Sequence, residues 1–239
     1  AMLVQAWRQA QPVRGLDGLS LADAACLRDR LVQSQQPALG RIVGYKAGLT
    51  SRAVQQRLGL DAPLRGVLLE KMLRPQDAAP LPAAYGARPV IEADLLVEVG
   101  DEAINAARTP LEALQGLSRI FPFIELADLG LAEDEPVTAA KILAINVGAR
   151  GGVTGEPVAV EATQAFADAL RDMRVVLRGA GGGPPAEASG AAILGHPLEA
   201  VLWLVQDLRK SGVRLKAGDV LSLGAFLPPL TPQPGAAYV

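Results

Sequence analysis

The spacing of apolar and polar residues along the chain predicts a mixture of helices and strands. Residues 20 to 35 carry an apolar stripe with helical spacing, and Ser20 is a good N-cap for it. A second stripe over residues 197 to 211, with Pro197 at its start and Gly212 after its end, predicts the clearest helix. Shorter helices are predicted over residues 51 to 58 and 109 to 118, and strands over residues 42 to 48, 90 to 99, 121 to 127 and 219 to 223. Together these elements predict an α+β fold with a strand-rich C-terminal part.

Prolines and alanines are concentrated in residues 75 to 89, a composition typical of a linker. The chain is therefore expected to divide into an N-terminal helical part, residues 1 to 75, and a β-rich domain, residues 76 to 239. Glycine clusters at residues 151 to 155 and 179 to 183 predict turns, the second at the tip of a hairpin.

Composition narrows the chemistry that the chain can perform. Half of its 239 residues are hydrophobic, enough for a full core. Cys26 is the only cysteine and His196 the only histidine, which excludes a disulfide within the chain and any metal site built from cysteines or several histidines. A bound metal would therefore sit among oxygens, which favours Mg²⁺, Mn²⁺ or Ca²⁺. His196 itself precedes Pro197 at a helix start, so we predict a capping or surface role for it.

Charge and hydropathy argue against two classes of partner. The net charge is −2 and no block of lysines or arginines occurs, so neither nucleic acid nor an anionic membrane surface is expected as a partner. No apolar run approaches the roughly 20 residues that span a bilayer. No signal peptide is visible at the N-terminus, and the expected location is the cytoplasm.

Three acidic residues stand in or beside the most strand-like segments. Alternation places Glu92 and Asp94 on one face of the strand over residues 90 to 99, about 7 Å apart at Cα. Glu125 interrupts the apolar strand over residues 121 to 127. Clustered carboxylates repel unless a cation or proton compensates, so the pattern is consistent with a metal site. The alternative is a solvated face for Glu92 and Asp94, with Glu125 ending an edge strand.

Lys46 lies between Gly44 and Gly48, which permit tight turns and the close approach of a ligand. A lysine there is suited to bind a substrate carboxylate or to polarise a carbonyl. The alternative is a surface lysine beside a helix cap. Both interpretations treat Lys46 as surface-like, and a surface lysine contributes little to stability. Lys46→Ala is therefore expected to leave the melting temperature nearly unchanged.

Five segments in order resemble motifs of one enzyme family. Residues 44 to 51, GYKAGLTS, resemble the G-Y-K-x-G-L-T-S signature of 2-keto-4-pentenoate hydratases and their decarboxylase relatives. Residues 91 to 95 resemble the family's E-x-E metal strand, and residues 123 to 128 its third-ligand strand. The segments over residues 195 to 204 and 212 to 224 are similar to its G-x-P-x-x-A-V-x-W-L helix and its closing glycine-rich motif. The order and spacing agree from residue 20 to residue 235.

The resemblance implies a strand-rich mixed β-roll of the fumarylacetoacetate hydrolase type, with a smaller N-terminal helical part and assembly into homo-oligomers. It implies Mg²⁺ or Mn²⁺ held by Glu92, Asp94 and Glu125. It also places Lys46 near the carboxylate and 2-oxo groups of a small 2-oxo acid substrate. A metal chelated by such an acid stabilises the enolate that forms during the reaction.

The chain departs from the family pattern at several positions. Asp94 replaces the second glutamate, and the hydratase segment D-x-x-A-D-N-A-S becomes KILAINVG over residues 141 to 148, which loses both acids and the serine. The closing G-S becomes Gly224-Ala225. We expect Glu70 to join Lys46 as a catalytic residue, replacing a lost polar group. The expected substrate-binding residues are Lys46, Leu49, Arg65, Asn146 and Arg150.

The leading hypothesis is a metal-dependent hydratase of 2-hydroxypenta-2,4-dienoate-like acids in the degradation of aromatic compounds. One alternative is a decarboxylase of 4-oxalocrotonate-like acids. Another is a non-catalytic paralogue that binds metal and small acids. Because Lys141, Ile145, Gly148 and Ala225 replace the polar groups of the family pattern, ketonisation or decarboxylation is expected to be more robust than hydration.

Overall fold

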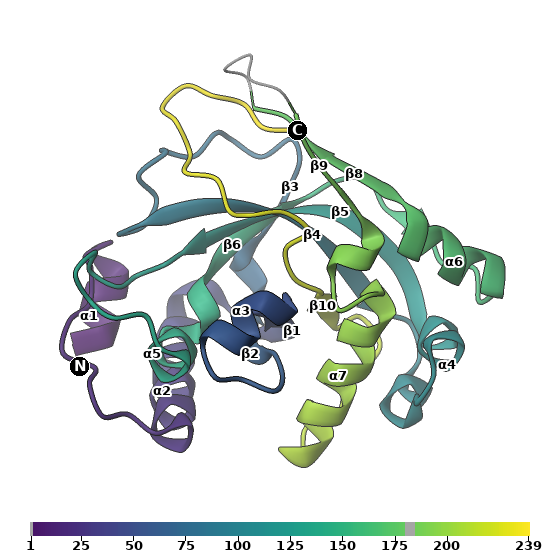
Figure 1. The fold of residues 1–239 in the computed structure, drawn as a ribbon, viewed down its shortest axis with the longest axis horizontal. Helices are drawn as coiled ribbons and strands as arrows, with labels where there is room; N and C mark the ends of the chain where they lie inside the picture. Colours follow the sequence, from purple (N-terminus) through teal and green to yellow (C-terminus); the bar gives the residue numbers. More distant parts are fainter. Residues whose placement is uncertain (1, 180–184) are drawn as a thin grey trace.

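A curved, mixed β-sheet forms the centre of the molecule. The structure is a computed structural model that describes residues 2–179 and 185–239. Seven strands follow the order β2-β1-β10-β4-β5-β6-β3, and the short β7 pairs with β5. The strands are β1 (Ile42–Gly48), β2 (Leu64–Leu69), β3 (Leu73–Pro75), β4 (Pro89–Val99), β5 (Leu117–Asp128), β6 (Ala149–Thr154), β7 (Val158–Ala159) and β10 (Val220–Ser222). The long strands β4 and β5 arch over the molecule (Figure 1). The α+β, strand-rich prediction is confirmed.

A separate hairpin joins β8 (Arg174–Leu177) to β9 (Ala186–Ser189). The glycine turn predicted over residues 179 to 183 falls between these two strands. Positions 180 to 183 of that turn lie outside the described residues.

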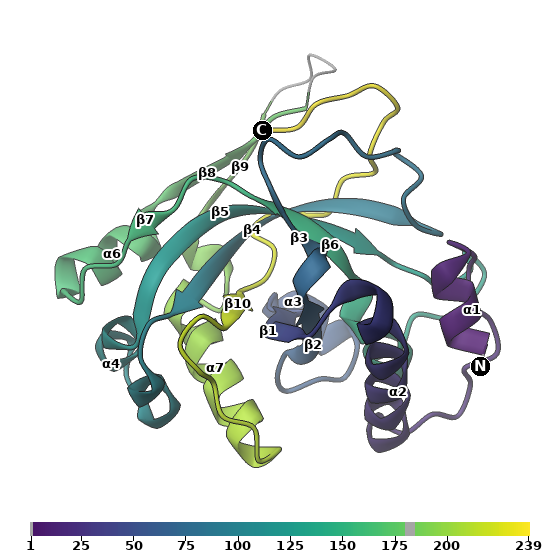
Figure 2. The same cartoon turned by 180° about the vertical axis from the view of Figure 1, so that it is seen from behind.

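The helices form two groups at opposite ends of the arch (Figures 1 and 2). One group holds α4 (Pro110–Gln115), α6 (Gln164–Asp172) and α7 (Pro197–Lys210); the other holds α1 (Met2–Arg8), α2 (Leu21–Leu39) and α5 (Ala139–Ala144). The short α3 (Arg52–Arg57) follows β1, and the 3-10 turns are η1 (Glu70–Met72), η2 (Glu102–Ala106), η3 (Asn146–Gly148) and η4 (Gly190–Ala192). None of the helices described is long and apolar enough to cross a membrane.

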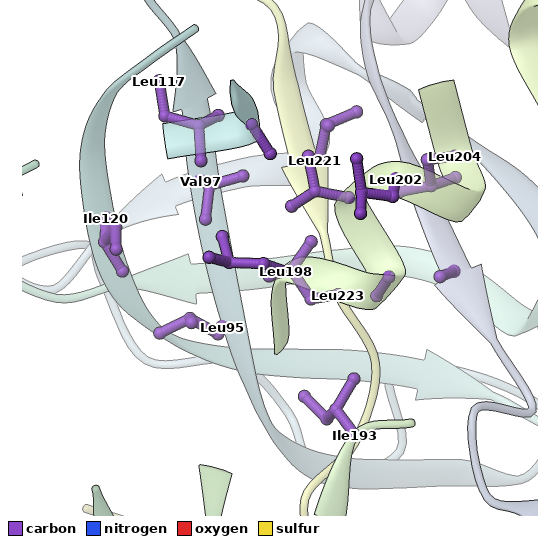
Figure 3. Packing of buried hydrophobic residues seen from close by; sticks show 14 of the residues in the cluster. Leu95, Val97, Leu117, Ile120, Ile193, Leu198, Leu202, Leu204, Leu221 and Leu223 are labelled. Carbon is purple, nitrogen blue, oxygen red and sulfur yellow. The ribbon is translucent and has the colours of Figure 1, made fainter. Parts of the chain in front are cut away.

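The largest part of the core lies between α7 and the middle of the sheet (Figure 3). Leu198 and Leu204 of α7 are fully buried against strand residues that include Val97 and Leu221. Each such leucine contributes about 1.5–3 kcal/mol to folding by leaving water. This packing fixes the position of β10, which lies between β1 and β4.

Helix starts agree with the capping residues of the sequence. The Ser20 hydroxyl accepts a hydrogen bond from the Asp23 backbone N–H at 3.1 Å. His196 Nδ1 accepts one from the Leu198 backbone N–H at 3.1 Å, which confirms the predicted cap. The helix after Thr109 ends at Gln115, before the predicted residue 118, because β5 begins at Leu117.

Strands from both ends of the sequence meet in the middle of the sheet. β10 pairs parallel with β1, which brings Ser222 opposite Lys46, and antiparallel with β4, which brings Ser222 opposite Leu96. The predicted boundary at residue 75 coincides with the end of β3, yet β1, β2 and β3 all belong to the central sheet. The division into two domains stays a prediction.

Candidate functional site

The strand pairing gathers the three predicted acids on one face of the sheet. β4 and β5 are antiparallel, with Glu92 directly opposite Glu125. Asp94 follows two residues later on the same face of β4. Asp94 and Glu125 are buried, and Glu92 is partly exposed to a cavity. The alternative of a solvated face for these acids is therefore wrong.

Lys46 joins the acids from β1. Its side chain is buried, and its ammonium group pairs with the Glu125 carboxylate and donates a hydrogen bond to the Val147 carbonyl at 3.1 Å. Gly66, opposite Lys46 on β2, leaves room for it, because a Cβ at Gly66 would lie 2.6 Å from Lys46 Cγ. Burial alone would lower the pKa of Lys46, but the charges of Glu125 and Glu92 outweigh it and raise that pKa. The surface alternative for Lys46 is wrong.

Asp94 is held by the end of β10. Its Oδ2 accepts a hydrogen bond from Ser222 Oγ at 2.7 Å, and its Oδ1 accepts from the backbone N–H groups of Leu223 at 3.1 Å and Gly224 at 3.0 Å. Oδ2 thus has a single donor and keeps a free lone pair. The shorter aspartate remains near Glu125, and burial together with the Glu125 charge raises the pKa of Asp94.

One oxygen of the cluster has no partner. Glu125 Oε2 is buried and accepts no hydrogen bond within the described chain. Among residues 2–179 and 185–239, no group of three acid, histidine or cysteine side chains is arranged as a ready metal site. Three carboxylates and one lysine nevertheless leave a formal excess of two negative charges. An orphaned oxygen and this charge excess fit one divalent cation among oxygen ligands.

The crowding of acids also shifts their protonation. Burial and the nearby charge of Glu125 raise the pKa of Glu92 to about 8, and the same two causes raise the pKa of Asp94 to about 7. Their ordinary values are 4.5 and 3.8. The metal-free site therefore holds protons near neutral pH, and a metal must displace them.

A pH-dependent stability follows from these shifts. Because Glu92 and Asp94 bind protons more tightly in the folded chain, their contribution is complete below their ordinary pKa values and is lost as pH rises to about 8. We expect the free energy of unfolding of the metal-free protein to fall between about pH 5 and pH 8, and Mg²⁺ to reduce that fall. Urea unfolding across this range with EDTA or with Mg²⁺ measures both. Stability that rises over this range without metal contradicts the assignment.

A cavity of about 150 Å³ opens beside the acids. Lys46 and Glu92 line its polar end, and Leu49 lines it as predicted. The remaining lining side chains are Arg88, Ala127, Leu129, Leu131, Val137, Ile142, Ile145 and Val147, with backbone from Gly48 and Gly148. A small acid in this cavity would have its polar head at the acids and its chain against apolar walls.

Strained backbone gathers at the same cavity. Leu49 and Val147 both line it, and both have positive φ angles, 59° and 54°. A β-branched residue in this region is an outlier whose strain is about 1–3 kcal/mol. At Val147 this conformation accompanies the carbonyl that accepts from Lys46. Such strain is typical of functional sites that need a fixed backbone.

Four predicted site residues lie away from the cavity lining. Asn146 uses its amide oxygen and nitrogen to bind the backbone N–H and carbonyl of Val67, at 2.8 and 2.9 Å. Arg65 pairs with Ala47 in the β1–β2 register, so its side chain points to the opposite face from Lys46. It contacts Asp207 at 3.2 Å. Asn146 and Arg65 therefore bind other parts of the protein and do not line the cavity.

Arg150 and Glu70 are also outside the cavity. The Arg150 guanidinium stacks 4.6 Å from the Trp7 ring centre and donates to Asp128 at 3.2 Å, which fastens α1 to the sheet. Glu70 is exposed, and its carboxylate lies against Gly40. A substrate contact by Glu70, Arg65, Asn146 or Arg150 has no support in this geometry.

The positions that depart from the family pattern separate into two kinds. Ile145 and Gly148 line the cavity, where they replace polar groups with apolar surface or bare backbone. Lys141 is buried away from the cavity lining and pairs with Glu135 and, at 2.8 Å, with Asp17. Arg88, which directly precedes β4, also lines the cavity, and the sequence did not predict it as a site residue.

Comparison with known proteins finds relatives that are 2-keto-4-pentenoate hydratases. No protein-family model matches the chain. A 2-keto-4-pentenoate hydratase of Paraburkholderia xenovorans (strain LB400) is 30% identical over 241 residues, covering 99% of this chain and 87% of the relative. A 2-keto-4-pentenoate hydratase of Burkholderia vietnamiensis (strain G4 / LMG 22486) is 31% identical over 202 residues, covering 83% of this chain and 73% of the relative. The chain belongs to the 2-keto-4-pentenoate hydratase family.

The fold agrees with that of solved structures. A 4-oxalocrotonate decarboxylase from Pseudomonas putida G7, complexed with calcium and acetate, has a TM-score of 0.83 at 22% identity, covering 99% of this chain and 88% of that one. The same decarboxylase complexed with magnesium and adipate gives a TM-score of 0.83 at 23% identity, covering 99% of this chain and 89% of that one. The predicted fumarylacetoacetate hydrolase-like fold is thereby confirmed.

Proposed function

We propose that this member of the 2-keto-4-pentenoate hydratase family is a divalent-metal-dependent hydratase of 2-hydroxypenta-2,4-dienoate-like acids from the degradation of aromatic compounds. The observation that carries the proposal is the cluster of Lys46, Glu92, Asp94 and Glu125 beside a small apolar cavity. The relatives named as hydratases support it, because they match this chain over nearly all of its length.

The metal is proposed to be Mg²⁺ or Mn²⁺, held by Glu92, Asp94 and Glu125. The orphaned Glu125 Oε2 and the free lone pair of Asp94 Oδ2 supply oxygens that hard cations prefer. The calcium and magnesium complexes of the decarboxylase with this fold support a divalent cation. When bound, such a cation supplies an electrophile that stabilises negative charge on the 2-oxo oxygen.

The protein's own residues would position the substrate and exclude water. The Lys46 ammonium, held by Glu125 and Val147, provides fixed positive charge for the carboxylate and 2-oxo groups at the polar end of the cavity. Ile142, Ile145 and Val147 surround the carbon chain and lower the local dielectric constant, which strengthens these charge interactions. Hydration adds the hydroxyl group of water at C4 and one proton each at C5 and C3, while the 2-hydroxyl group loses its proton and becomes the 2-oxo group.

One observation favours a second candidate function. Glu92 is the only carboxylate that lines the cavity within the described chain, and no hydroxyl side chain lines it there. Hydration needs a group that activates water, whereas proton exchange or loss of CO₂ through an enolate does not. The decarboxylase alternative for 4-oxalocrotonate-like acids therefore remains a second proposal.

Product analysis separates these functions. The purified protein is incubated with 2-hydroxypenta-2,4-dienoate or with 4-oxalocrotonate, each with Mg²⁺ and with EDTA. A hydratase forms the 4-hydroxy-2-oxo acid only with Mg²⁺; a decarboxylase releases CO₂ from 4-oxalocrotonate. Deuterium incorporation at C3 of a 2-oxo acid reports enolate formation alone. Metal binding without any of these activities would overturn both enzyme proposals and support the non-catalytic paralogue.

Assembly and location stay proposals. We propose a homo-oligomer in the cytoplasm that acts on a small 2-oxo acid, as the family resemblance implies. Sedimentation velocity of the purified chain tests the assembly directly, since a monomer at micromolar concentration would contradict it.

A further inference from the structure

A second, smaller void lies directly behind one wall of the cavity beside the acids. It measures about 20 Å³ and lies against α1, and its apolar lining includes Leu3, Trp7, Val13 and Leu31. None of these four residues lines the larger cavity of about 150 Å³. Ile145 and Gly148, by contrast, line both spaces and therefore lie between them.

The backbone half of this wall is held in place. Gly148 has a positive φ of 70°, and a Cβ there would lie 3.1 Å from the Asp128 carbonyl oxygen. The Asp128 carboxylate accepts hydrogen bonds from the backbone N–H groups of Ala87 at 3.0 Å and Arg88 at 2.8 Å. A shift of the chain at Gly148 would disturb these contacts, so the wall is rigid there.

The other half of the wall is the Ile145 side chain. It is buried, and a Cβ at Gly130 would lie 3.4 Å from its Cδ1, which is ordinary van der Waals contact. Gly130 follows Leu129, whose backbone N–H donates to the Arg88 carbonyl at 3.0 Å. The two chain segments thus stay paired four residues beyond Glu125, about 13 Å of extended chain. Ile145 therefore closes the cavity at the end remote from the acids.

We propose that Ile145 is a specificity-determining residue, which limits the site to 2-oxo monoacids with short tails by separating the cavity from the void against α1. This inference rests on the proposed function, because the tail points at Ile145 only when the 2-oxo acid head lies at the acid and lysine end. Ile145 offers no hydrogen-bond partner, so it acts through its volume alone. A longer tail would overlap with this side chain, and a close-packed interior tolerates little overlap.

Two saturated monoacids that differ only in tail length test the proposal. 2-Oxopentanoate has five carbons, and 2-oxooctanoate has eight. Calorimetric titration with Mg²⁺ is expected to show that the parent protein binds 2-oxopentanoate at least about 10-fold more tightly, because the extra methylene groups do not fit. In Ile145→Ala the affinity for 2-oxooctanoate should rise about 10- to 50-fold as these groups enter apolar space, with 2-oxopentanoate changed by less than about 3-fold.

Leu3→Ala is the matched control, because it removes as many carbon atoms as Ile145→Ala but on the far side of the wall. It enlarges the void without opening it to the cavity, so both affinities should stay unchanged. Filling the void from behind, by adding Leu3→Phe to Ile145→Ala, should remove most of the gain for 2-oxooctanoate. Ile145→Val removes a single methylene group and should give the same shift at about 3-fold, which keeps the test valid if the alanine variant does not fold.

Equal affinity of the parent protein for the two acids overturns the inference. An Ile145→Ala protein that gains no affinity for 2-oxooctanoate also overturns it. An equal gain in Leu3→Ala has the same consequence, because looser packing of α1, rather than the loss of the wall, would then admit the tail.

Turnover of 2-hydroxypenta-2,4-dienoate, measured in parallel, distinguishes this inference from the proposed function. Turnover by the parent protein, with no change of tail preference in Ile145→Ala, rejects the role of Ile145 and retains the hydratase. A changed preference in Ile145→Ala, without turnover of the dienoate or of 4-oxalocrotonate by the parent, retains the limit on tail length and rejects the enzyme. If neither acid binds in the presence of Mg²⁺, both are overturned.

Discussion

Replacing Lys46 with methionine should lower the free energy of unfolding of the metal-free protein by about 3–5 kcal/mol near pH 8, because it removes one partner of a buried ion pair. The change leaves Glu92, Asp94 and Glu125 without a nearby cation. Urea unfolding measures the loss. Mg²⁺ should restore part of it, since the metal neutralises the same carboxylates.

Lys216→Met is the control for the Lys46 variant. Lys216 is exposed, and its replacement should change the free energy of unfolding by no more than about 0.5 kcal/mol. Equal stability of the Lys46→Met and Lys216→Met proteins would contradict the buried pair. The sequence alone led us to expect an almost unchanged melting temperature on loss of Lys46, but that expectation assumes a surface lysine, and Lys46 is buried.

Replacing Glu125 with glutamine should strongly lower metal-dependent turnover while affecting stability less than the Lys46 change does. A metal supplies several kcal/mol of transition-state stabilisation, so the rate should fall by about 10³-fold. The affinity for Mg²⁺ should fall with it, because Glu125 supplies the orphaned oxygen. The variant also removes the Glu125 charge, which raises the pKa values of Glu92 and Asp94. Loss of this repulsion between carboxylates offsets part of the stability that is lost when the contact to Lys46 weakens.

Titration calorimetry with Mg²⁺ and Mn²⁺ measures the metal affinity of the Glu125→Gln protein. Glu98→Gln is a suitable control, because Glu98 lies on β4, the strand of Glu92 and Asp94, but pairs with Arg119 at 2.6 Å. That variant should bind metal as the parent does. Unchanged affinity in Glu125→Gln would remove Glu125 from the metal site.

The local elements of the fold were predictable because their signals are local. Ser20, Thr109 and His196 cap helices where the sequence predicts helix starts. Alternation in the strand over residues 90 to 99 placed Glu92 and Asp94 on one face. By contrast, β6 was not predicted, because its glycines have little tendency to form a strand. Its pairing with β5 stabilises it as a strand.

The candidate site was only partly predictable because its geometry depends on strand register. The pairing of Glu92 with Glu125, and the burial of Lys46 between β2 and β10, come from residues far apart in sequence. The same register explains why Arg65 is unsuitable: it pairs with Ala47 and so faces away from Lys46. Arg88 was missed because it precedes the strand, where alternation was not applied.

The central position of β10 has a consequence for the synthesis of the protein. β1 and β4 both pair with Val220–Ser222 rather than with each other, so Lys46 and Asp94 cannot take up their final arrangement until this late segment has been made. Contacts over such long sequence separations form slowly, because the intervening chain must first close into a large loop. In a nascent chain that has emerged from the ribosome only as far as β9, β1 and β4 can pair with β2 and β5, but each still has one unpaired edge. Such a chain needs protection from aggregation until β10 inserts between them.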